Sequence, residues 1–526
     1  MSLGLFDIVG PIMHGPSSNH TGGANRIGFL AHELMGGTPE KITYGFHPIF
    51  LRIFTGHRTH VALTAGCLGI REDDPASTQA LETAKRRGIT LDYVAVPEKD
   101  ADRNTMRVMG CFDGTCWEIN GISPGGGYVI ISRINSLELR YDGGRTLYYR
   151  SADRICASEE EVASFFEREG IRPLTLRTGS WNGRDELCVE VPESLSAGQE
   201  QAFDAALSAK GELIRRTVRP LHDFAERAGC VPLFDSFASL LEAAKSASLI
   251  DLAYQYEENH SGQKKDAVLA QGLRIVSVLR DSIEQGLRGD NPLLCGFCSG
   301  SDGRDVLAFG TGGGSLAGPV VNEAMANALA LAERSASSGR VVAAPTSGAA
   351  GALPGTLFSV ARHLQKSDTE LAEAFLVSAL LGLLIGEKGS FAGSVAGCQV
   401  EIGIGAAMAA GASVFLAGGS AEQVVDAAMI SLSNCFGLTC DQPASPVEVP
   451  CIKRNAFGAS TAIMGAELAL AGVKSAMPAD DVIAGFLDIQ RRMPEGTHGG
   501  CMGGLAVSPY AAKMRRKWDE IRSRKG

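Results

Sequence analysis

The sequence predicts an α+β protein of several domains, in which an α/β region precedes a largely all-α region. The chain has 526 residues, enough for two to four domains of ordinary size. Helical patterns alternate with β-rich runs up to about residue 150, whereas beyond Phe237 the sequence is rich in Ala, Leu and Gly and has almost no alternating runs. We therefore expect an α/β domain over 1–150, a small α/β insert or linking region over 151–235 and a helical domain over 236–526.

Local patterns predict strands in the first two of these regions. The runs TLDYVAVP (90–97) and GGYVIISRI (126–134) are rich in β-branched and aromatic residues, and the glycine triplet 125–127 interrupts the chain before the second run. In the insert, residues 186–191 predict a strand between two charged segments with helical spacing.

The helical region carries recognisable helix starts. Pro319 is expected near the first position of a helix, because proline is tolerated there. Ser420 and Gln423 form the pattern of a capping box ahead of an apolar run, which predicts another helix start. The mixed charges of KMRRKWDEIRSRKG (513–526) predict a solvated C-terminal helix.

Composition and charge exclude several function classes. The chain has 49 basic and 59 acidic side chains, a net charge of -10, which disfavours binding to nucleic acid or anionic membranes. The apolar stretch 374–386 is too short to cross a membrane, and 402–419 is mostly Gly and Ala, which suits a helix buried in protein. The N-terminal residues lack the pattern of an export signal, so we expect a cytoplasmic protein.

Thirteen cysteines in such a protein predict reduced thiols rather than disulfides. Three prolines lie between and beside Cys440 and Cys451, so both thiols are expected on one rigid, irregular loop that could bind a metal. Cys398 lies 42 residues before Cys440, and spacing alone does not bring it to the same place. Metal ligation and plain burial both remain open for these thiols, and also for the lone pair Cys295 and Cys298.

Two histidine motifs and two glycine-rich segments could also carry chemistry. In MHGPSSNHTGG (13–23), several hydroxyl and amide side chains could cap a helix whose free N–H groups would accept a carboxylate near His20. His57 and His60 lie three residues apart at a predicted helix start and could bind zinc or supply a base. The segments 310–318 and 344–355 favour close helix packing or anion binding, because they lack the Lys of a nucleotide-binding loop.

Taken together, these motifs resemble the iron–sulfur-dependent L-serine dehydratases, also called L-serine ammonia-lyases. The similar segments, from about residue 5 to about 507, are GPSSNHT, GHRTH, PTSGAAGALPG, GCQVE, GLTCD, VPCIKRNA and GGLAV. The resemblance implies a β-like N-terminal portion fused to an α-like catalytic portion, and a [4Fe-4S] cluster on Cys398, Cys440 and Cys451. The iron without a protein ligand would act as a Lewis acid on the substrate's β-hydroxyl.

The same resemblance implies the other roles at the site. His57 would be the base that takes the Cα proton, and the products would be pyruvate and ammonia, in amino-acid catabolism and gluconeogenesis. It also implies a homodimer. The expected substrate-binding residues are Ser17, Ser18, His20, Thr21, Thr346, Ser347 and Gly348.

Some positions depart from the family pattern, and they keep alternatives open. His60, Ala350 and Cys501 replace other residue types, in segments expected near the substrate, and Cys501 could cap the open iron. The same chemistry could therefore act on L-cysteine, L-threonine or another β-hydroxy acid. A non-catalytic amino-acid sensor and a pyridoxal phosphate enzyme with Lys388 as Schiff base are the other hypotheses.

Overall fold

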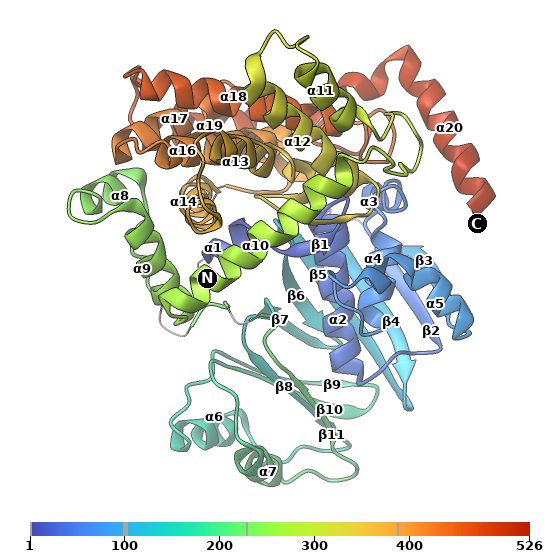
Figure 1. The fold of residues 1–526 in the computed structure, drawn as a ribbon. Helices are drawn as coiled ribbons and strands as arrows, with labels where there is room; N and C mark the ends of the chain where they lie inside the picture. The colour runs from blue at the N-terminus through green and yellow to red at the C-terminus, as the bar shows by residue number, and fades with distance from the viewer. Residues whose placement is uncertain (1–2, 98–103, 223, 228–229, 387–388, 526) are drawn as a thin grey trace.

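A computed structural model describes residues 3–97, 104–222, 224–227, 230–386 and 389–525 (Figure 1). Figure 1 shows two regions: sheets formed by the first half of the chain, and helices of the second half packed on one side of them. The predicted fold class, an α/β region followed by a largely helical region, is confirmed.

The first region is built on a six-stranded sheet with the order β3-β2-β4-β5-β6-β7. Only β2 and β3 are parallel; the other pairs are antiparallel. The strands are β2 (Lys41–Phe46), β3 (Thr90–Ala95), β4 (Thr105–Phe112), β5 (Thr115–Gly125), β6 (Tyr128–Ile134) and β7 (Leu137–Tyr141). The helices of this region are α2 (Ala24–Met35), α3 (Pro48–Leu51), α4 (Thr59–Cys67) and α5 (Ala80–Arg86). Apolar side chains of α2 and α4 share a core with the sheet, and both predicted strands are present as β3 and β6.

The hairpin between β4 and β5 corrects one prediction. Cys111 and Cys116 face each other across the two strands, with their Cα atoms 3.9 Å apart, and form a disulfide. The expectation that all thiols are reduced is therefore wrong. The antiparallel register brings these two side chains together, and this register is not visible in the composition. The other cysteines of the described residues are free thiols.

A second sheet follows, with the order β11-β8-β10-β9 and antiparallel pairing throughout. Its strands are β8 (Thr146–Ala152), β9 (Thr175–Trp181), β10 (Arg184–Val191) and β11 (Ile214–Val218), and its helices are α6 (Glu159–Arg168) and α7 (Ala197–Ala206). The predicted strand 186–191 lies within β10. Strand β8 begins at Thr146, before the boundary expected at residue 150. The chain therefore passes from the first sheet to the second through the short segment between Tyr141 and Thr146.

The second half of the chain is helical. Its helices are α8 (Phe237–Ala243), α9 (Leu249–Ser261), α10 (Lys265–Gly286), α11 (Asp302–Thr311), α12 (Gly318–Ala336), α13 (Ala352–His363), α14 (Asp368–Gly386), α15 (Gly393–Ala396), α16 (Ile402–Leu416), α17 (Ala421–Ser433), α18 (Cys451–Leu470), α19 (Ala479–Arg492) and α20 (Pro509–Lys525). Helix α12 has Pro319 in its first turn, and the Ser420–Gln423 capping box opens α17, as predicted. The C-terminal helix is α20.

The two most apolar segments of this region lie inside the protein. Asp368–Gly386 and Cys398–Leu416 are long and apolar enough to span a membrane, but 83% and 89% of their most apolar windows are buried. Both contribute to the main hydrophobic core, which surrounds α14 and α16. Cys398–Leu416 is a core helix, as the Gly and Ala content of 402–419 predicted. The stretch 374–386 was predicted to be too short to cross a membrane, but it belongs to a longer helix, Asp368–Gly386, which is also buried in the core.

The first residues of the chain join the two halves. Leu5 and Ile8 of the short helix α1 (Leu5–Ile8) lie in the core of the helical region. The next element, β1 (Ile12–His14), pairs antiparallel with β12 (Arg340–Val342) from the helical region. The chain then runs directly into the segment that contains Ser17 and His20. This pairing holds an N-terminal motif against the helical half.

Candidate functional site

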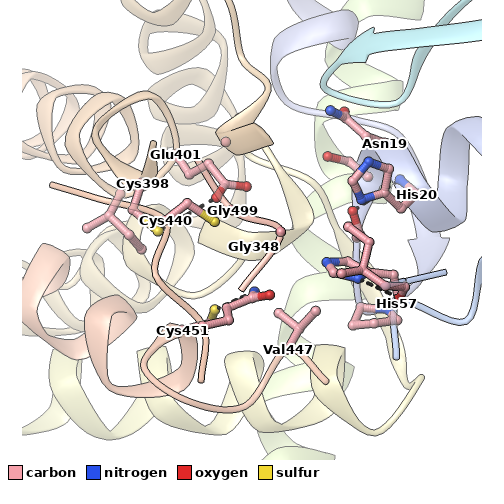
Figure 2. Close-up of a pocket in the computed structure, with 18 residues that line it drawn as sticks. Asn19, His20, His57, Gly348, Cys398, Glu401, Cys440, Val447, Cys451 and Gly499 are labelled. Carbon is pink, nitrogen blue, oxygen red and sulfur yellow. Dashed lines mark hydrogen bonds between the residues drawn. The ribbon is translucent and has the colours of Figure 1, made fainter. Parts of the chain in front are cut away.

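A cavity lies where the two halves of the chain meet. Its walls include residues 16–20 and His57 from the N-terminal region, together with Cys398, Cys440 and Cys451 from the helical region. Figure 2 shows the three thiols on one side of the cavity and the two imidazole rings of His20 and His57 on the other. Residues more than 300 positions apart therefore face one space.

The histidine side is built around a turn of π-helix, Ser18–Gly23, which runs into α2. The Ser17 hydroxyl accepts a hydrogen bond from the His20 N–H and caps this turn. The Thr21 hydroxyl donates to the carbonyl of His57 at 2.8 Å. These contacts bring the His20 and His57 rings to 4.9 Å between their centroids, in an edge-to-face arrangement.

Hydrogen bonds fix which nitrogen of His57 is free. Its Nδ1 lies 3.1 Å from the carbonyl oxygen of Ile53. A carbonyl only accepts, so Nδ1 carries the proton and Nε2 of the neutral ring keeps its lone pair. Burial lowers the pKa of His57 to about 4 and that of His20 to about 3. Both rings are therefore neutral at pH 7, and His57 can accept a proton.

The cysteine side is assembled from three separate segments. Cys398 opens a single 3-10 turn just before α16, and Cys451 is the first residue of α18. Cys440 is held through its backbone: its N–H donates to the carbonyl of Thr497, and its carbonyl accepts from Gly499. Cys398 and Cys451 are buried and Cys440 is partly buried. The sequence could not place Cys398 here, because its approach depends on how α16 packs against α18.

The thiols are close enough to affect one another. The hydrogen bond between Cys440 and Cys398, together with burial, raises the pKa of Cys440 well above its ordinary value. Burial, and the nearby Cys398, raise the pKa of Cys451. The Arg454 guanidinium lies against Cys398 and pairs with Asp441 at 2.8 Å. Raised pKa values keep the Cys440 and Cys451 thiols protonated at pH 7, and a bound metal would supply the positive charge that stabilises their thiolates.

The three thiols have the chemistry of iron–sulfur cluster ligands, because such clusters are held by cysteine thiolates. Within the described ranges, no group of three or more His, Cys, Asp or Glu side chains is arranged to hold one metal ion. Each cysteine of an iron–sulfur cluster binds a different iron, so its thiols need not converge on one point. Three thiols that line one cavity, with hydroxyl and imidazole groups opposite, fit a cubane that has one iron without a protein ligand.

Glu401 also lines the cavity, although no motif in the sequence pointed to it. It precedes α16, and its Oε1 accepts a hydrogen bond from the Thr346 hydroxyl at 2.8 Å. Burial raises its pKa, while the Thr346 hydrogen bond and the charge of Arg454 oppose this rise. The signal in the sequence was an acidic residue three positions after Cys398, inside an otherwise apolar stretch.

The structure divides the predicted site residues into two groups. Those that line the cavity are Ser17, Ser18, His20, His57, Gly348, Cys398, Cys440 and Cys451. The cavity lining does not include Thr21, Thr346 or Ser347. Thr21 and Thr346 instead contact lining residues, and Ser347 hydrogen-bonds Ser335 behind the cavity wall.

The substitutions expected near the substrate lie elsewhere. His60 packs beside Phe54 and Tyr93, Ala350 is fully buried, and Cys501 contacts the core of the six-stranded sheet. None of the three lines the cavity.

Two other features singled out in the sequence are the Cys295–Cys298 pair, which is not among the residues that line the cavity, and Lys388. The buried pair Cys295 and Cys298 lies on a loop whose N–H groups at Cys295 and Phe297 donate to the Glu448 carboxylate. The loop thereby supports the segment before Cys451. Lys388, the alternative Schiff-base residue, lies outside the described residues.

Comparison with known proteins identifies the family. The profile of the family described as "Serine dehydratase alpha chain" matches residues 244–506, half of the chain, including all three cavity cysteines. The chain belongs to this serine dehydratase family. The "Probable L-serine dehydratase, alpha chain" of Bacillus subtilis (strain 168) is 34% identical over 287 residues, covering 54% of this chain and 95% of that protein.

Two further relatives of the serine dehydratase family each match about half of the chain. The "L-serine dehydratase, alpha chain" of Peptoniphilus asaccharolyticus is 34% identical over 276 residues, which cover 52% of this chain and 93% of that protein. The "L-serine dehydratase" of Streptomyces coelicolor is 32% identical over 271 residues, 51% of this chain and 60% of that protein. The family profile covers the helical half, whereas the histidine motifs lie in the half that precedes it.

Proposed function

We propose that this chain is an L-serine ammonia-lyase that holds a [4Fe-4S] cluster on Cys398, Cys440 and Cys451. The observation that carries this proposal is the cavity, in which three thiols face a histidine with a free imidazole nitrogen. Membership of the serine dehydratase family supports L-serine as the substrate. When bound, such a cluster supplies a Lewis-acidic iron for the substrate's hydroxyl and carboxylate.

The protein's own groups account for the proton transfer. We assign the Cα proton of L-serine to Nε2 of His57, because Nδ1 is committed to the Ile53 carbonyl. A neutral base in a buried cavity is available without prior deprotonation at pH 7. Ser17, Ser18 and His20 line the wall beside it and are placed to orient the substrate. Loss of the proton and of the β-hydroxyl leaves an enamine, which tautomerises and hydrolyses to pyruvate and ammonia.

The predicted domain organisation and setting are part of the proposal. A β-like domain over 1–150, a linking region over 151–235 and a catalytic domain over 236–526 would act together, since the cavity takes residues from the first and the last. We propose a cytoplasmic homodimer, supported by the burial of both apolar helices and by the frequency of symmetric oligomers among soluble enzymes.

The test is anaerobic loading with iron and sulfide, followed by iron analysis and measurement of pyruvate from L-serine. We expect about four irons per chain. Cys440→Ser should lose iron and activity. The matched control Cys435→Ser removes a buried thiol of the helical region that does not line the cavity, and it should keep both. Iron-free protein that turns over L-serine would overturn the proposal, as would faster release of a keto acid from L-cysteine or L-threonine.

A further inference from the structure

The substrate of the proposed reaction carries a positive charge that the groups considered so far leave unpaired. A cation moved from water into a buried cavity needs a nearby anion, because desolvation is costly without one. An imidazole ring is either neutral or positively charged, so His20 and His57 cannot supply this anion. We propose that Glu401 binds the α-ammonium group of the amino-acid substrate and so selects amino acids over hydroxy acids. This inference rests on the proposed function.

Glu401 has the right chemistry and the right place. Among the described residues that line the cavity, it is the single carboxylic acid; the other polar groups are hydroxyls, imidazoles, amides and thiols. Figure 2 shows its carboxyl group directed from the start of α16 toward the space between the thiols and the histidines. An ammonium held there would place the substrate's Cα between the cluster side and His57.

One oxygen of Glu401 is fixed and the other is available. Oε1 accepts from the Thr346 hydroxyl at 2.8 Å, which sets the plane of the carboxylate. Oε2 accepts a long hydrogen bond, 3.9 Å, from the Cys398 thiol. A carboxylate accepts several hydrogen bonds, so Oε2 retains capacity for a charged donor.

Two glycines keep the space around this carboxylate open. A Cβ atom at Gly348 would lie 2.7 Å from Oε1, and one at Gly393 would lie 2.6 Å from Oε2. Any larger residue at either position would push the carboxylate out of place. Both glycines line the same cavity as Glu401, so the space left by their missing side chains opens into the cavity where the substrate would bind.

The pairing would also assist the chemistry. An amino group that stays protonated beside a carboxylate withdraws electrons from Cα and makes its proton easier to remove. L-Glycerate has the same skeleton and configuration as L-serine, but a hydroxyl replaces the ammonium. Glu401 should therefore favour L-serine over L-glycerate by charge, whereas the hydroxyl and carboxylate contacts are common to both.

The experiment compares the binding of these two compounds by calorimetry in cluster-loaded protein. All variants carry His57→Asn, so that L-serine binds without being consumed. Adding Glu401→Gln keeps the shape of the side chain and removes its charge. We expect the dissociation constant of L-serine to rise about 10-fold to 100-fold and that of L-glycerate to change less than about 3-fold. Iron content should stay unchanged.

Two further variants keep the test informative. Thr346→Val removes the hydroxyl that orients Glu401 and should shift the L-serine to L-glycerate ratio in the same direction, by a smaller factor. Glu257→Gln neutralises a buried glutamate of α9 that does not line the cavity, and it should leave the ratio unchanged.

Several results would overturn the role of Glu401 and leave the proposed function standing. These are an unchanged L-serine affinity in Glu401→Gln, an equal loss for both ligands, or a loss of iron, which would assign Glu401 to support of the cluster. In each of these cases the wild-type protein still releases pyruvate from L-serine. Loaded wild-type protein that releases none would instead overturn the proposed function, and the inference with it.

Discussion

Asn455 connects the glycine-rich segment at the cavity to the helix that carries Cys451. The side chain is buried, one turn into α18. Its Oδ1 accepts hydrogen bonds from the N–H groups of Gly351 and Ala352, at 2.9 and 3.1 Å. Its Nδ2 donates to the carbonyls of Gly348 and Cys451, at 2.9 and 3.0 Å. A single amide therefore joins the loop over the cavity to the start of α18.

Asn455→Leu should destabilise the helical region strongly. Leucine has a similar size and offers no hydrogen bond, so the N–H groups of Gly351 and Ala352 and the carbonyl of Gly348 lose this partner. The carbonyl of Cys451 keeps its bond within the helix. An unsatisfied buried group costs about 1–3 kcal/mol, so three of them lower the free energy of unfolding by at least about 3 kcal/mol.

Urea unfolding of the metal-free protein, followed by far-ultraviolet circular dichroism under reducing conditions, measures this loss. The control is Asn434→Ala, which removes an exposed asparagine near the end of α17 and should cost less than about 0.5 kcal/mol. A loss below about 1 kcal/mol in Asn455→Leu, with an unchanged dependence on urea, would refute the reasoning. It would mean that the loop and α18 do not depend on this amide.

Two more predictions concern the N-terminal half. Burial lowers the pKa of His57 to about 4 in the folded protein, against about 6.5 in the unfolded chain. Between pH 6.5 and 4 the unfolded chain therefore binds more protons than the folded protein, and the free energy of unfolding falls as the pH falls. At pH 5 this group alone lowers the free energy of unfolding by about 2 kcal/mol. His57→Asn should flatten the dependence of the urea-derived stability on pH. The control His363→Gln changes an exposed histidine and should leave this dependence as in the wild type. The same dependence on pH in the wild type and in His57→Asn would contradict the prediction. Cys111→Ser opens the hairpin disulfide and should lower stability by about 2 kcal/mol. A reducing agent should produce the same loss in the wild type and none in the variant, whereas Cys156→Ser, at an exposed free thiol, is the control.

Local signals determined much of the secondary structure. The Ser420–Gln423 capping box and Pro319 marked helix starts correctly, because a cap acts within one turn of its own residue. The run 186–191 was recognisable as a strand from its residue types. The Cys111–Cys116 disulfide was missed, because it depends on which residues of two strands face each other. His60 and Cys501 do not line the cavity, although their motifs lie near lining residues in the sequence, since a motif does not fix the direction in which a helix or loop presents its side chains.

The sequence by itself determined the residue types of the site: thiols near a proline-rich loop, and histidines beside hydroxyl caps. Only the tertiary structure decided that they share one cavity. Cys398 reaches Cys451 because α16 packs against α18, and His20 reaches the thiols because β1 pairs with β12 of the helical half. Contacts between residues hundreds of positions apart arise from packing of whole elements, and no local pattern encodes that geometry. Glu401 gains its proposed role in the same way, through the cavity it faces rather than through its neighbours in the chain.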